Sequence, residues 1–75
     1  MKSEKHTYRL GSNTMCYAPG IIAWAINGYK FKEDRDNILN VVLAWDIPEQ
    51  VAKDLLSEKI PYTVEDESVV IEVEA

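Results

Sequence analysis

The stretch IIAWAINGYKF, at residues 21–31, decides the first half of the fold. Asn27 and Gly28 stand between two runs rich in β-branched and aromatic residues, and both accept the positive φ angles that a type I′ hairpin turn requires. A competing interpretation is a buried helix over residues 20–27 with Gly28 beyond its end, which the Ala, Ile and Trp content tolerates. The hairpin is favoured over the helix, with strands near residues 21–26 and 29–32.

Two helices are predicted after this stretch, at residues 34–45 and 47–58. Acidic residues at the start of the first helix complement the positive end of its dipole. In the second helix, Asp46 and Glu49 have the spacing of an N-cap residue and a carboxylate that reaches back to it. Pro48 suits the first turn because it lacks an N–H. One stripe of this helix is apolar and is expected to face the core: Val51, Ala52, Leu55 and Leu56.

The chain ends in a second predicted hairpin, whose turn lies around residues 65–68. Its last strand has an apolar face, made of Val69, Ile71 and Val73, and a second face made of Val70, Glu72 and Glu74. A short strand is predicted at residues 6–10, and residues 1–5 are expected to be frayed. The sequence therefore predicts a single small α+β domain over residues 1–75, in the order β-hairpin, two short helices, C-terminal β-hairpin.

Charge is distributed unevenly along the chain, whose formal net charge is −5. Five of the eight Lys and Arg residues lie before residue 33, whereas twelve of the thirteen acidic residues lie at residue 33 or after it. Clustered Lys and Arg side chains bind duplex phosphates with release of counterions, so a net-negative chain is a poor candidate for binding bare nucleic acid. The favoured partner is a basic protein surface.

The residue types that carry catalysis or metal binding are scarce. His6 is the only histidine and Cys16 the only cysteine, so neither a nucleophile with an oriented base nor a zinc site is expected. The three glycines are isolated and form no phosphate-binding loop. We therefore expect no catalytic residue, no metal and no cofactor, and a chain that is not an enzyme.

The order of two helices at residues 34–45 and 47–58 followed by a hairpin resembles the helix, helix, wing order of small winged-helix or excisionase-like DNA-binding proteins. The string SEKIPYTVEDESVVIEV is similar to their entry into the wing. This resemblance implies a small DNA-binding regulator as an alternative function. The basic residues available for it are Lys2, Lys5, Arg9, Lys30 and Lys32.

The favoured function is a non-enzymatic protein that binds a basic protein partner. Acidic rows on a rigid hairpin imitate the spacing of phosphates, which a nucleic-acid enzyme recognises. The most concrete version is a phage or mobile-element inhibitor of such a host enzyme, of the anti-CRISPR or anti-restriction type. The candidate contact residues are Glu65, Asp66, Glu67, Glu72 and Glu74, with Met15 and Tyr17 as the apolar part of the surface.

Two other interpretations stay open. Glu72 and Glu74 are also explained as charges on an edge strand that prevent sheet-to-sheet aggregation. A chain of this length buries only about 60% of its unfolded surface, so a homodimer or a self-associating structural protein is a further alternative. The charged start MKSEKHTYRL and the lack of a long apolar run predict no signal peptide and no membrane span. We expect a cytoplasmic protein, located in the host cytoplasm if a phage encodes it.

Overall fold

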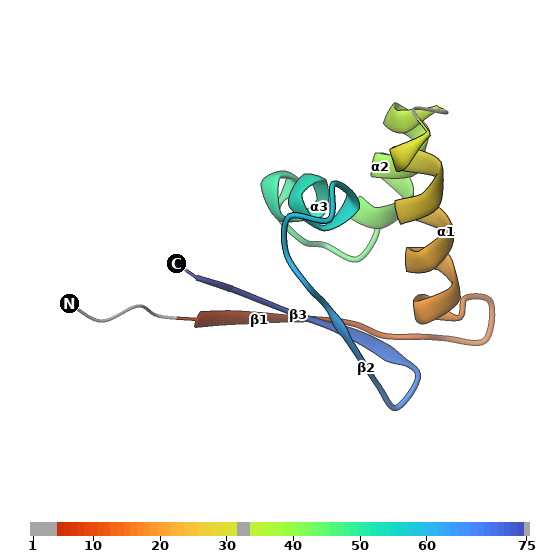
Figure 1. The fold of residues 1–75 in the computed structure, drawn as a ribbon. Helices are drawn as coiled ribbons and strands as arrows, with labels where there is room; N and C mark the ends of the chain where they lie inside the picture. The colour runs from red at the N-terminus through yellow and green to blue at the C-terminus, as the bar shows by residue number, and fades with distance from the viewer. Residues whose placement is uncertain (1–4, 32–33, 75) are drawn as a thin grey trace.

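The computed structural model describes residues 5–31 and 34–74, which form three helices and one three-stranded antiparallel sheet (Figure 1). The helices lie on one side of the sheet. The predicted α+β class is confirmed, although the helices number three rather than two. In chain order the elements are β1 (Lys5–Leu10), α1 (Ala18–Lys30), α2 (Arg35–Leu43), α3 (Glu49–Leu56), β2 (Thr63–Glu65) and β3 (Ser68–Glu74).

The predicted N-terminal hairpin is wrong, because residues 18–30 form the helix α1. Ala18, Ile22 and Ala25 follow one another at helical spacing and are all fully buried. A helix places these three side chains on one face toward the core, whereas a strand, whose side chains alternate between two faces, would not. Gly28 is helical and has no positive φ. Its lack of a side chain lets α2 approach closely, since a Cβ added at Gly28 would lie 2.7 Å from Cδ1 of Ile38.

The predicted helices at residues 34–45 and 47–58 are confirmed with shorter bounds, as α2 and α3. The expected capping by Asp46 is wrong. Pro48 is the N-cap residue of α3 and no side chain caps this helix, while Asp46 has a left-handed backbone with a φ of 58°. The turn between the two helices therefore bends at Asp46 before the helix begins.

The apolar stripe predicted for α3 faces the core, with Ala52, Leu55 and Leu56 buried. On its outer side Nζ of Lys53 lies 2.9 Å from a carboxylate oxygen of Glu49. The hydrogen bond to Glu49 and the charge of that carboxylate raise the pKa of the Lys53 amine above its usual value. Both side chains are exposed, so this ion pair contributes little to the stability of the fold.

The sheet has the order β1-β3-β2, and both neighbours run antiparallel to β3. The C-terminal hairpin is thus confirmed, and Lys5, which was expected in a frayed terminus, begins β1 opposite Glu74. β3 is the middle strand of the sheet. β2 pairs only with the first three residues of β3, so within the described residues one side of β3 has no neighbouring strand at Glu72 and Glu74, and the edge-protection interpretation of these two carboxylates stays a prediction.

The core lies between the helices and the inner face of the sheet. The predicted alternation on β3 holds, since Val69 and Ile71 are buried while Glu72 and Glu74 are exposed. Apart from Val70, which is covered on the outer face, the buried residues form one cluster drawn from β1, the three helices, the α2–α3 turn and β3: Leu10, Ala18, Ile22, Ala25, Ile38, Val42, Ile47, Ala52, Leu55, Leu56, Val69 and Ile71. This core is small, as expected for so short a chain.

Candidate protein-binding surface

The loop at residues 11–17 and the turn of the β2–β3 hairpin are held together by one serine. The Ser12 hydroxyl donates a hydrogen bond to the backbone carbonyl of Glu67. The same oxygen accepts a hydrogen bond of 2.8 Å from the backbone N–H of Ala18, the first residue of α1. Ser12 thereby connects three elements and satisfies an N–H at the start of the helix. Residues from the two ends of the chain meet at this point.

The hairpin turn projects two carboxylates from a constrained backbone. Asp66 and Glu67 have φ angles of 47° and 63°, so both central positions are left-handed, as in a type I′ turn. Among the residues that the structure describes, neither side chain forms an ion pair. The turn therefore presents two negative charges at a fixed place in the fold.

Met15 and Tyr17 lie in the loop that Ser12 holds against this turn. Met15 is 91% exposed and Tyr17 is 55% exposed, and both are among the most exposed large apolar side chains of the described chain. We use the name tip surface for the exposed side chains that this loop and this turn carry: Met15, Tyr17, Asp66 and Glu67. This arrangement joins four of the seven residues that the sequence singled out.

The other three candidate residues, Glu65, Glu72 and Glu74, lie on the outer face of the sheet among basic side chains. A carboxylate oxygen of Glu65 lies 3.4 Å from Arg9, and one of Glu72 lies 3.9 Å from Lys5. Glu74 stands opposite Lys5 at the far end of β3 from the turn. The five acidic residues therefore do not form one continuous row, and only the two in the turn belong to the tip surface.

Two exposed aromatic side chains of α1 were missed by the sequence analysis. Trp24 is 52% exposed and Phe31, at the C-cap position, is 64% exposed. Together with Tyr17 they repeat every seven residues, which places all three on one side of a helix. We call Tyr17, Trp24 and Phe31 the α1 row. The seven-residue spacing was visible in the sequence, but the hairpin interpretation concealed it.

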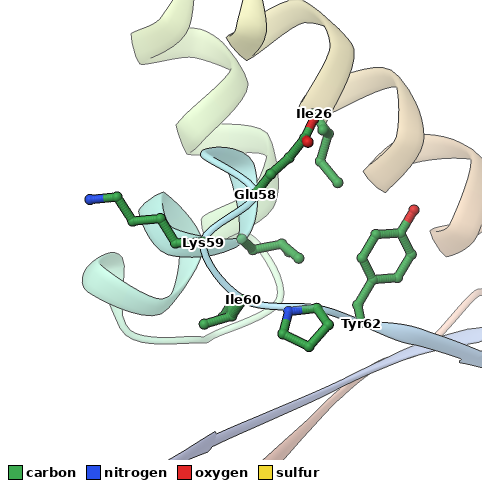
Figure 2. A pocket seen from close by; sticks show the side chains of 7 residues that line it. Ile26, Glu58, Lys59, Ile60 and Tyr62 are labelled. Carbon is green, nitrogen blue, oxygen red and sulfur yellow. The ribbon is translucent and has the colours of Figure 1, made fainter.

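Two of the pockets that border the helices have volumes near 500 Å³. The first, of about 500 Å³, lies between α1, the end of α3 and the segment that leads to β2 (Figure 2). In Figure 2 the Glu58 carboxylate and the Tyr62 hydroxyl both reach toward α1, whereas Lys59 points away. The second pocket, of about 480 Å³, is a groove beside α1 that Ile21, Val41 and Trp45 line together with Gly11, Asn13, Cys16 and Ala44.

Neither pocket gathers the groups of a catalytic centre. A nucleophile must lie beside a base that activates it, and the first pocket offers one carboxylate and one phenol over apolar walls. Within residues 5–31 and 34–74, no three His, Cys, Asp or Glu side chains lie together in a way that would hold a metal ion.

The basic residues of the DNA-binding alternative are not brought together in the described chain. Lys5 and Arg9 lie on the outer face of β1 and pair with carboxylates of the sheet, while Lys30 ends α1. Lys2 and Lys32 lie outside the described residues. On α3, the helix that would enter a DNA groove, Glu49 and Asp54 are among the outward residues.

In comparisons with models of protein families, with curated proteins and with solved structures, no match to this chain was found. A search of the described residues for a bilayer-spanning helix found none with the necessary length and apolar character.

We expect the variant Ser12→Ala to lower the free energy of unfolding by about 1 to 2 kcal/mol, because it removes two hydrogen bonds that join three elements. Urea denaturation monitored by circular dichroism measures this change. Ser57→Ala serves as the control, because Ser57 is exposed and no hydrogen bond of its hydroxyl is found in the described structure. Equal stability of the Ser12 variant and the wild type would show that Ser12 does not hold the tip surface together.

Proposed function

We propose that this chain is a non-enzymatic protein that binds a basic protein partner through its tip surface. The observation that carries this proposal is the hydrogen bond from Ser12 to Glu67, which ties the loop that carries the exposed Met15 to the acidic turn. Apolar side chains next to fixed charges are typical of binding surfaces, where the apolar part gives affinity and the charges select the partner.

The chemistry of the tip surface indicates which groups a partner needs. Asp66 and Glu67 require Lys or Arg side chains opposite them, and Met15 requires an apolar recess on the same partner. A nucleic-acid enzyme offers basic side chains in the channel that accepts phosphates. We therefore keep an inhibitor of such an enzyme, encoded by a phage or another mobile element, as the specific form of the proposal.

The test is capture of binding proteins from a bacterial lysate with the tagged chain, at low and at high salt, read by mass spectrometry. We expect a basic protein that is retained at low salt and released at high salt, because exposed charge pairs are screened. The double variant Asp66→Asn, Glu67→Gln should lose this protein. Adding duplex DNA to the lysate should displace it as well if the contact is in a nucleic-acid channel.

The matched control is Asp34→Asn, Asp46→Asn, which also removes two exposed carboxylates from residues with left-handed backbones. These positions flank α2 and lie outside the tip surface. If the tip variant and the control variant capture the same proteins as the wild type, the tip surface is not the binding site.

DNA binding is the second candidate, because α2, α3 and the β2–β3 hairpin do follow the helix, helix, wing order. The acidic turn stands where the wing would need Lys or Arg for phosphate contacts. A titration with random duplex DNA separates the two functions: the regulator would bind and weaken as salt rises, whereas we expect no binding at any salt concentration.

A further inference from the structure

The outward side of α1 is apolar or small along almost its whole length. The helix contains a single charged residue, Lys30, at its C-terminal end. Gly20, Ala23 and Asn27 are exposed between the aromatic side chains of the α1 row. A helix at a protein surface normally places charged residues toward solvent, and a helix without them is normally covered on both sides. Figure 1 shows α1 at the margin of the helical layer, so its outer side is available for a contact.

The two ends of the α1 row have complementary shapes. At the C-terminal end Phe31 projects as an exposed aromatic ring. At the N-terminal end the groove of about 480 Å³ opens beside the row, with Ile21 of α1 and Val41 and Trp45 as apolar walls. The Trp45 ring is fixed there, because its Nε1–H donates a hydrogen bond of 3.1 Å to the carbonyl of Gly11.

We propose that a second copy of this chain docks on the α1 row, with the two α1 helices antiparallel around a two-fold axis near Trp24. In this arrangement each Phe31 lies opposite the N-terminal end of the partner helix and enters the partner's groove. A two-fold interface uses the same patch on both copies, so the patch must be complementary to itself. The α1 row meets this condition, because Phe31 projects at one end and the groove lies at the other.

The area available agrees with a small dimer interface. An aromatic side chain offers about 150 to 250 Å² of surface, and those of the α1 row are just over half exposed, so they contribute roughly 300 Å² per copy. A standard interface buries about 800 Å² per partner, and weak ones bury about 600 Å² or less. The groove walls and the exposed Gly20, Ala23 and Asn27 supply apolar and backbone surface beyond the three rings.

Charge favours a second copy over a basic partner at this place. Two copies with a net charge of −5 each repel one another, so a face that carries no carboxylates is the contact with the least repulsion. The α1 row is such a face, whereas a basic partner would find its complementary charges at the acidic turn. Tyr17 belongs to both the tip surface and the α1 row, and Asn13 and Cys16 of the groove lie in the same loop as Met15. Trp24 belongs to the α1 row alone, so a change at Trp24 tests the dimer without altering Met15 or the turn.

Sedimentation equilibrium of the full chain between about 1 and 500 µM tests the proposal, since this range covers the affinities of small interfaces. We expect a monomer–dimer equilibrium for the wild type and at least a tenfold weaker dimer for Trp24→Glu, because this variant places two carboxylates near the two-fold axis. The matched control is Val64→Glu, because Val64 on β2 is 52% exposed, as is Trp24. It should dimerise like the wild type.

A second measurement on the wild type alone uses Cys16, which lines the groove. Its reaction with N-ethylmaleimide should slow as protein concentration rises, because Phe31 of the second copy covers the groove. The proposal is overturned by a wild type that stays monomeric, by a dimer that Trp24→Glu leaves unchanged, or by a Cys16 reaction rate that is independent of concentration. Should Trp24→Glu fail to fold, the wild-type equilibrium and the Cys16 rate decide.

Discussion

Replacing Ile22 with alanine is expected to lower the free energy of unfolding by about 3 kcal/mol. Ile22 is fully buried in the core cluster that α1 forms with α2, α3 and the sheet. Removing its outer carbons leaves a cavity that a small core cannot close, and changes of this kind cost about 2 to 5 kcal/mol. Thermal and urea denaturation followed by circular dichroism measure the loss, at concentrations below that of the dimer equilibrium.

Asn27→Ala is the companion variant, because it distinguishes the helix from the hairpin by the sign of its effect. In α1 Asn27 is an exposed residue in the helix interior, where alanine is more favourable than asparagine by about 0.5 kcal/mol. In a type I′ turn the same change would be destabilising, since alanine resists a positive φ. A destabilised Asn27 variant, together with a tolerated Ile22 variant, would contradict the helix.

Replacing Gly28 with valine is expected to cost about 2 to 3 kcal/mol. The missing side chain of Gly28 is what allows Ile38 of α2 to pack against α1, with Cδ1 only 2.7 Å from where a Cβ would be. Valine adds three carbons at this contact and its β-branch restricts its rotamers in a helix, so α1 and α2 must separate. The midpoint of urea denaturation should fall accordingly.

Gly28→Ala is the matched control for this contact. A single added methyl group meets only the far end of the Ile38 side chain, and alanine is favoured over glycine in a helix by about 1 kcal/mol. The two effects oppose one another, so we expect a change of less than about 1 kcal/mol. If valine is tolerated as well as alanine, the close contact between α1 and α2 does not exist.

The helix α3 and the strand β3 could be predicted from local sequence patterns, because in each of them the spacing of the apolar residues fits only one type of secondary structure. The apolar stripe of α3 and the alternation of Val69, Ile71 and Glu72 match the periods of a helix and a strand, and the structure confirms both. The stretch at residues 21–31 could not be predicted in this way, since β-branched and aromatic residues around Asn27 and Gly28 suit both a hairpin and a helix. Packing against Ile38 and the core decided between them.

The candidate surface could be predicted only in part for a similar reason. Met15, Tyr17 and the acidic turn were identified by residue type, but the contact between the loop and the turn that carry them depends on Ser12, whose bond to Glu67 joins positions 55 residues apart. No local pattern predicts such a contact. The pairing of Glu65 with Arg9 and of Glu72 with Lys5 depends in turn on the β1–β3–β2 order, which the sequence did not reveal.

Photo-crosslinking from position 15 is the most direct test of the tip surface. A benzoylphenylalanine in place of Met15 is irradiated in a bacterial lysate, with the same residue at Val64 as the control for an exposed apolar position. We predict an adduct between position 15 and a basic protein, which Asp66→Asn, Glu67→Gln abolishes and position 64 does not give. The same adducts from both positions, or none from position 15, would contradict a partner at the tip surface.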